Sequence, residues 1–153
     1  EYDIVQCPPG TPPSQCVQVI TSRRRVQDLL SGCSTTTSPW CTGIGSNDPA
    51  KTAGIKLMYA GPHCHAPTCL SMELYNADTG ALLCRVEPLA GRGGPDPYDE
   101  ERFLAIPPCL WGSSAEGLPE PELLPLHTTI LSIKRSNSTW GHTGDMASWQ
   151  MRG

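Results

Sequence analysis

Two short segments of the chain carry residue types that can bind a metal. His63-Cys64-His65 places two imidazoles two residues apart. Because residues i and i+2 of a strand point to the same face, a strand here predicts two neighbouring imidazoles, with Cys64 on the opposite face, where it can form a disulfide. The second segment, His142 to Met146 (HTGDM), offers a further imidazole and a thioether. Sulfur ligands select copper and imidazole also suits it, so the two segments together predict a copper site.

Simpler interpretations and other kinds of site stand beside this one. His63 and His65 can be two exposed histidines next to a disulfide, and Met146 can be a packing residue of a strand. A zinc site is a poorer match, because the cysteine spacings never give two CxxC pairs. A cupin site, in which an acidic residue follows HxH, is also a poorer match. Glu73 lies eight residues after His65, which is longer than the usual cupin spacing. No GxSxG motif of a serine hydrolase is present.

Three stretches of the sequence carry a family resemblance: HCH at 63–65, ELYNADTGALLC at 73–84 and HTGDM at 142–146. In these residues the chain resembles the C-terminal part of the secreted plant family of stress up-regulated nodulin proteins. More distantly, the order HxH, hairpin, Cys and Met resembles the second catalytic domain of the copper type II, ascorbate-dependent monooxygenases. In that domain, which is a jelly-roll-like sandwich, an HxH pair and a later methionine bind copper.

The resemblance extends over residues 55–151 and implies that His63, His65 and Met146 are the copper ligands. For His142 it implies either a further ligand or a group that supports the ligands. The monooxygenases bind a second copper through a histidine pair in a preceding domain, whereas residues 1–50 contain no histidine. A complete two-copper hydroxylase is therefore excluded within these 153 residues. We expect a single copper site that binds the metal or does one-metal redox chemistry, and whether the chain is an enzyme stays open.

Short strands must position these residues. The clearest is a hairpin in which Cys69 to Asn76 and Ala81 to Glu87 are joined by the turn Ala77 to Gly80. Further strands are predicted at residues 17–20, 54–60, 103–106, 128–134 and 145–151. This pattern predicts an all-β fold, an antiparallel, jelly-roll-like β-sandwich. At most one short helix is expected, near residues 23–31, with Ser22 as its N-cap.

The cysteine content indicates an oxidising compartment. Eight cysteines in a chain of this length predict four disulfides and a secreted, disulfide-rich protein. They are Cys7, Cys16, Cys33, Cys41, Cys64, Cys69, Cys84 and Cys109. Cys7 with Cys16 is a plausible local pair, and the sequence leaves the other pairings open. The sequon at Asn137 predicts a glycosylated surface loop.

Composition limits the partners that this single domain can have. We expect residues 1–50 to form a loop-rich, disulfide-stapled segment packed on a sandwich core of residues 51–153. The net charge of −4, with 17% charged residues, argues against a nucleic-acid partner. No apolar run reaches the length of about 20 residues that a membrane-spanning helix needs.

Two further functions compete with the copper site. A disulfide-rich sandwich can be a structural subunit of an extracellular matrix or fibre, and EYDIVQ at residues 1–6 can add as a strand to a second copy. Alternatively, EYDIVQ pairs within its own domain. A glycan-binding module is the other possibility, because four tryptophans could form a platform for sugars. They are Trp40, Trp111, Trp140 and Trp149.

Overall fold

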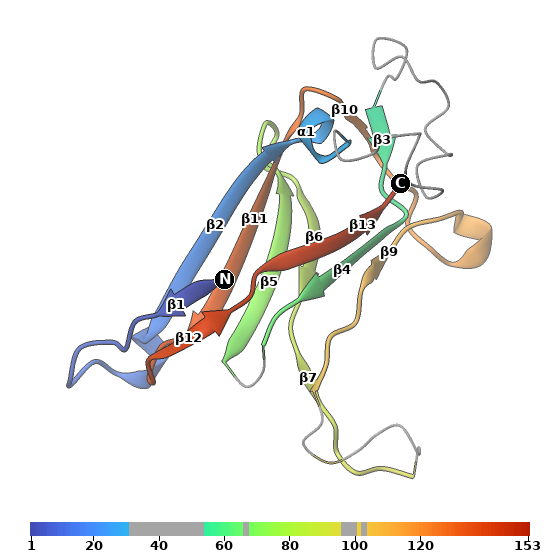
Figure 1. Ribbon diagram of the computed structural model, residues 1–153. Helices are drawn as coiled ribbons and strands as arrows, with labels where there is room; N and C mark the ends of the chain where they lie inside the picture. The colour runs from blue at the N-terminus through green and yellow to red at the C-terminus, as the bar shows by residue number, and fades with distance from the viewer. Residues whose placement is uncertain (31–53, 66–67, 96–100, 102–103) are drawn as a thin grey trace.

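The largest element of the fold is a four-stranded antiparallel sheet with the strand order β2-β11-β5-β6 (Figure 1). The computed structural model describes residues 1–30, 54–65, 68–95, 101 and 104–153. The strands of this sheet are β2 (Val17–Arg25), β11 (Thr129–Asn137), β5 (Cys69–Asn76) and β6 (Leu82–Val86). β11 pairs with β2 over the full nine residues of both strands, so the two long strands form the centre and one edge of the sheet.

A second, three-stranded sheet lies across β5 and β6 (Figure 1). It has the order β13-β4-β9, with bounds Ser148–Arg152, Tyr59–His63 and Cys109–Leu110. The main core lies between the sheets, with Ala60 from β4 beside Leu74 from β5 and Ile130 from β11, and with Trp149 and Met151 of β13 packed against them. The all-β, antiparallel sandwich that the sequence predicts is therefore confirmed.

Shorter elements complete the described part of the chain. Three two-stranded pairs are β1 with β12, β10 with β3 and β7 with β8. Their bounds are β1 Tyr2–Ile4, β12 His142–Asp145, β10 Leu123–Pro125, β3 Gly54–Lys56, β7 Leu89–Ala90 and β8 Leu104–Ala105. The helical elements are α1 Val26–Leu30 and two 3-10 turns, η1 Pro13–Gln15 and η4 Ser114–Glu116. No helix among the described residues is long and apolar enough to cross a bilayer.

The helix near residues 23–31 begins later than predicted. Arg23 to Arg25 continue β2, and α1 begins only at Val26. Ser22 is consequently not an N-cap, because it pairs with Ser132 of β11. Pairing with β11 supplies main-chain hydrogen bonds to alternate residues of β2 as far as Arg25, which outweighs the helical preference of an isolated segment. The region before residue 51 is thus not only loops, since β2 is a nine-residue edge strand of the main sheet.

Two predicted strands are each divided in the structure. Residues 54–60 give β3 and the first half of β4, separated by the buried Leu57, whose side chain belongs to the core. Residues 145–151 do not form one strand, because β12 ends at Asp145 and β13 begins at Ser148. The bend between β12 and β13 lets the chain leave β1 and join β4, which are partners in different sheets.

The hairpin at residues 69–87 is confirmed closely. β5 has the predicted bounds, and β6 is one residue shorter than predicted at each end. The Asn76 Oδ1 atom accepts from the backbone N–H of Asp78 (3.1 Å) and of Thr79 (3.4 Å), which forms an Asx turn. Gly80 completes the turn at φ +77°, a conformation that favours glycine.

Three disulfides join six of the cysteines in the described residues. They are Cys7–Cys16, Cys64–Cys69 and Cys84–Cys109. The local pair Cys7–Cys16 is therefore confirmed, and Cys84–Cys109 ties β6 of the large sheet to β9 of the small one. The prediction for Cys33 and Cys41 concerns residues outside the described ranges.

Candidate metal site

The HxH segment has the side-chain alternation that the sequence predicts. His63 ends β4 and is exposed, Cys64 is 5% exposed, and His65 is exposed again. The Cys64 side chain forms a disulfide with Cys69 and packs with Met72 in a small second core. The disulfide therefore lies beneath the two histidines and anchors the backbone between them to the interior.

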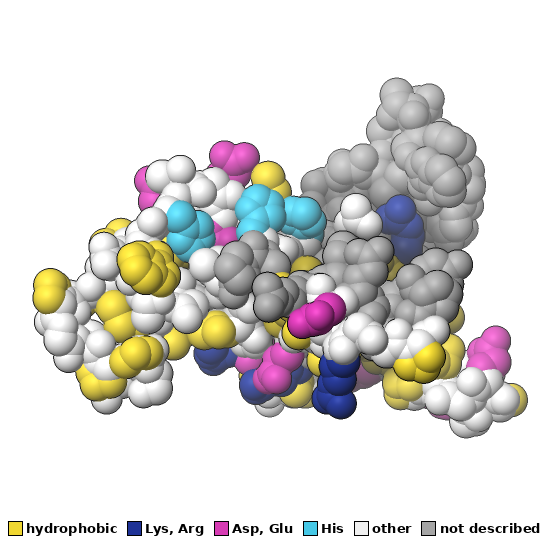
Figure 2. Space-filling model, turned by 90° about the horizontal axis from the view of Figure 1, so that it is seen from below, with side chains coloured by type: hydrophobic (Ala, Val, Ile, Leu, Met, Phe, Trp, Pro, Cys, Tyr) yellow, Lys and Arg dark blue, Asp and Glu magenta, His cyan; other side chains and the backbone are white. Residues whose placement is uncertain are grey.

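The two imidazoles lie at a separation that suits one shared ion. The ring centroids of His63 and His65 are 5.3 Å apart and the ring planes are 81° to each other. With a metal–nitrogen distance of about 2.0–2.1 Å, each ring centre would lie about 3.2 Å from an ion. Two rings 5.3 Å apart would then subtend an angle of about 110° at that ion. Figure 2 shows histidine side chains close together along one side of the molecule.

Met146 lies in the bend that leads from β12 to β13. It is half-buried, and the next residue, Ala147, packs with Trp149 against the core that contains Cys64. The β4–β13 pairing ends with Ser148 opposite His63, and Met146 lies two residues before Ser148, outside both strands.

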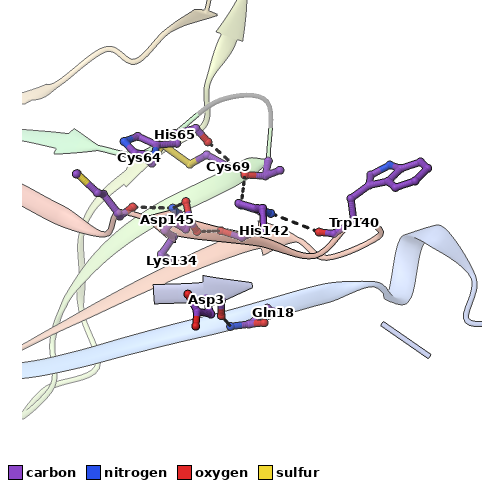
Figure 3. A network of polar contacts seen from close by, with 12 residues as sticks. Asp3, Gln18, Cys64, His65, Cys69, Lys134, Trp140, His142 and Asp145 are labelled. Atoms are coloured by element: carbon purple, nitrogen blue, oxygen red, sulfur yellow. Dashed lines mark hydrogen bonds and ion pairs between the residues drawn. A yellow bond between two sulfur atoms is a disulfide. The ribbon is translucent and has the colours of Figure 1, made fainter. Parts of the chain in front are cut away.

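A buried polar cluster adjoins Met146, and the sequence pattern did not reveal it (Figure 3). Lys134 and Asp145 are both 0% exposed, and the Lys134 Nζ atom donates to Asp145 Oδ1 at 2.5 Å. Nζ also donates to the backbone carbonyl of Met146 at 2.6 Å. Ser136 Oγ donates to Asp145 Oδ2 at 2.8 Å. The signal that could have found the cluster is parity, since Lys134 and Ser136 share the face of the buried Ile130.

His142 lies next to this site but is held by other groups (Figure 3). Its Nε2 atom is 3.3 Å from Thr68 Oγ1, and its Nδ1 atom is 3.3 Å from the backbone carbonyl of Trp140. The Thr68 hydroxyl also reaches the His65 carbonyl at 3.4 Å, which links His142 to the backbone of the HxH segment. Over the described ranges, no three His, Cys, Asp or Glu side chains form a group that could hold a metal. His142 therefore does not complete a three-histidine cluster with His63 and His65.

A second polar cluster lies on the opposite face of the large sheet. Glu73 is 1% exposed, and it accepts from Arg135 at 2.5 Å and from the Tyr75 hydroxyl at 2.9 Å, with Arg85 at 3.4 Å. Burial raises the pKa of Glu73, but hydrogen bonds from Arg135 and Tyr75 and the charges of Arg135 and Arg85 outweigh it, so the pKa is lowered. The hydrogen bond to Glu73 raises the pKa of Tyr75. Glu73 is therefore stabilised as a carboxylate by these cations. Both of its oxygens have partners, so neither is free for a metal.

The remaining predicted site residues lie apart from the histidines or are packed. Asn137 ends β11, and its Oδ1 atom accepts from the backbone N–H (2.8 Å) and the hydroxyl (2.7 Å) of Thr139. Trp111 and Trp149 are half-buried, whereas Trp140 is 76% exposed, and Trp40 lies outside the described residues. The tryptophans for which side chains are described thus do not form one exposed platform.

The N-terminal segment EYDIVQ pairs within its own chain. β1 is antiparallel to β12, with Tyr2 opposite Asp145 and Ile4 opposite His142. The Gln18 side chain of β2 reinforces this arrangement, because it donates to the Asp3 carbonyl and accepts from the Val5 N–H, both at 2.8 Å (Figure 3). Within the described chain, β1 therefore already has β12 as its partner strand.

Comparison of the chain with protein-family models, with curated proteins and with solved structures gives no match. The functional interpretation therefore depends on the geometry of the site.

Proposed function

We propose that the protein binds one copper ion through His63, His65 and Met146. The observation that carries the proposal is the pair of exposed imidazoles 5.3 Å apart on a backbone anchored by the buried Cys64 disulfide. Such an arrangement leaves the ring nitrogens accessible while restricting the movement of the main chain between them. A preorganised pair of ligands loses less conformational entropy when it binds a metal.

The choice of copper follows from the third ligand. Within the described residues no third His, Cys, Asp or Glu side chain gathers with the two histidines. Met146 lies two residues before Ser148, the partner of His63, which makes its thioether the candidate third ligand, and thioether with imidazole is a donor set that favours Cu(I). The resemblance to the copper type II monooxygenases, whose second domain uses HxH and Met, supports the same assignment. When bound, copper would supply a redox-active centre on the protein surface.

A titration with Cu(I) in competition with a chromogenic chelator tests this function. We expect one ion per chain, a large loss of affinity in His63→Ala and a smaller loss in Met146→Ile, because a soft ligand is removed in the latter without disturbing the histidines. The chain offers matched controls in His127, which is exposed on the loop before β11, and Met58, which is 46% exposed. The variants His127→Ala and Met58→Ile should bind like wild type. Equal binding by all four variants would contradict the proposal.

We also propose that the protein works outside the cell. Three disulfides in the described chain are the pattern of an oxidising compartment. Asn137 lies in a sequon at the end of a strand, so a glycan there is expected on material from a secretory host. A mass decrease on treatment with an N-glycosidase, absent in Asn137→Gln, checks this modification.

Glycan binding is a second candidate function, and one observation favours it. The Trp140 indole is 76% exposed and projects away from the sheet (Figure 3). An exposed indole can stack on the face of a pyranose ring, as tryptophans commonly do with other flat apolar faces. Retention of wild type but not Trp140→Ala on immobilised oligosaccharides would support glycan binding, whereas equal elution would exclude it.

A further inference from the structure

The buried ion pair of Lys134 and Asp145 lies where the chain changes sheets. Asp145 is the last residue of β12 and pairs with Tyr2, while Ser148, three residues later, pairs with His63. Gly144, just before the pair, has φ +76°, a left-handed conformation that turns the chain. The backbone direction at Met146 is therefore set by the few residues from Gly144 to Ser148.

Lys134 bridges the two sides of this bend. Its Nζ atom donates to the Asp145 carboxylate on one side and to the Met146 carbonyl on the other, at 2.5 and 2.6 Å. The second carboxylate oxygen is held by Ser136, which stands two residues from Lys134 on β11. The Asp145 side chain and the Met146 carbonyl are thus attached to β11 by three hydrogen bonds.

A charge pair in this position is a poor source of stability. Both side chains are 0% exposed, so both charges have lost their hydration, and a buried pair of this kind often contributes less than apolar residues of the same volume. What the pair supplies is geometry, because charge-assisted hydrogen bonds are short and directional. Every buried side-chain nitrogen and oxygen atom of the described residues has a hydrogen-bond partner, and this includes the atoms of the cluster.

We infer that Lys134 and Asp145 are positioning residues that aim the Met146 thioether at the ion held by His63 and His65. The inference rests on the proposed copper site and adds the reason that the methionine stays in place. Neither side chain would touch copper, since both are enclosed by the core while the histidines are exposed. Removing the pair should therefore loosen the sulfur ligand and leave the two imidazoles unaffected.

The test compares Cu(I)-loaded variants by X-ray absorption and by Cu(I) affinity. Replacing both partners, Lys134→Met with Asp145→Leu, avoids a lone buried charge and preserves the volume. The matched control is Arg135→Met with Glu73→Gln, which removes an ion pair from the next residue of the same strand on the other face. Should the apolar pair fail to fold, the amide pair Lys134→Gln with Asp145→Asn removes both charges, shortens the side chain that reaches the Met146 carbonyl and decides by the same readout.

The expected result is the loss of sulfur scattering in the Lys134–Asp145 variant, with the imidazole scattering retained. Its Cu(I) affinity should fall about 10- to 100-fold, to the level of Met146→Ile, while the control keeps sulfur scattering and wild-type affinity. A folded variant that keeps the full sulfur signal overturns this inference and leaves the proposed function standing. A wild-type protein that binds no Cu(I), or binds it without sulfur, overturns both.

Discussion

Adjacent residues of β11 enter two ion pairs that differ in almost every physical respect. Lys134 points into the sandwich and meets Asp145, with both side chains 0% exposed. Arg135 points outward and meets Glu73, where the arginine is 38% exposed and Arg85 offers a second cation. Figure 2 shows a group of Lys, Arg, Asp and Glu side chains on the side of the molecule away from the histidines, and further acidic side chains beside the histidines.

The two faces of β11 thus carry ion pairs with different physical roles. The outward cluster has several partners around one carboxylate and solvent nearby, so losing one cation leaves the others in place. The inward pair is fully enclosed, so solvent cannot replace a missing partner. We therefore expect the inward pair to determine local geometry near the candidate copper site, and the outward cluster to contribute modestly to stability.

The largest expected effect comes from breaking the inward pair on one side. Lys134→Met leaves the Asp145 carboxylate buried without its cation, which should lower the free energy of unfolding by about 3–5 kcal/mol. The matched outward change, Arg135→Met, should lower it by less than about 1 kcal/mol, because Glu73 retains Arg85 and Tyr75. Urea denaturation of both variants measures the difference. Similar losses of unfolding free energy in the two variants would show that the inward and outward pairs do not differ in this way.

A double substitution sharpens the same contrast. Lys134→Met with Asp145→Leu should recover most of the stability lost by Lys134→Met, because no charge remains buried and the volume is filled. The coupling energy between the two positions, obtained from a double-mutant cycle, should be several times larger than that between Arg135 and Glu73. An additive result at the inward pair would show that the two charges do not depend on each other.

The strand pattern explains why the sequence predicted the hairpin and missed this pair. The hairpin at residues 69–87 depends on local turn chemistry at Asn76 and Gly80, which a sequence displays directly. The inward orientation of Lys134 depends instead on Asp145, which reaches it from a strand of another sheet. A lysine followed by an arginine, as Lys134 is by Arg135, ordinarily indicates a solvent-facing position, and only its distant partner reverses that expectation.

The same reason accounts for the success and the limits of the site prediction. The alternation of exposed His63, buried Cys64 and exposed His65 was predicted from strand geometry, and it is present although β4 ends at His63. The extension of β2 through Arg25 follows from nine residues of pairing with β11, which no local signal announces. The bend after Asp145 likewise depends on which strands are available as partners in space.

A smaller effect is expected from pH on the outward cluster. The pKa of Glu73 is lowered from its ordinary value of 4.5 in the folded protein, so its contribution to stability is fully present above that value. The contribution is lost as the pH falls through the lowered folded pKa and Glu73 takes up a proton. In Glu73→Gln, unfolding midpoints between about pH 7 and pH 3 should therefore decline less steeply than in wild type. Parallel declines would show that other carboxyls dominate the acid transition.

The smallest effect is expected at the rim of the outward cluster. Arg85 and Glu87 form an ion pair at 2.5 Å, but they are 53% and 56% exposed. Because solvent and salt screen such pairs, Glu87→Gln should leave the thermal midpoint unchanged within the error of calorimetry. A clear decrease would indicate that the rim charges hold Arg85 against Glu73.

The proposed copper site is tested most directly by locating copper in the protein. Crystals grown with Cu(I) and measured at the copper absorption edge would show each ion as an anomalous peak. We predict one strong peak within bonding distance of ring nitrogens of His63 and His65 and of the Met146 sulfur. A peak at other residues, or histidines without one at saturating Cu(I), would contradict it.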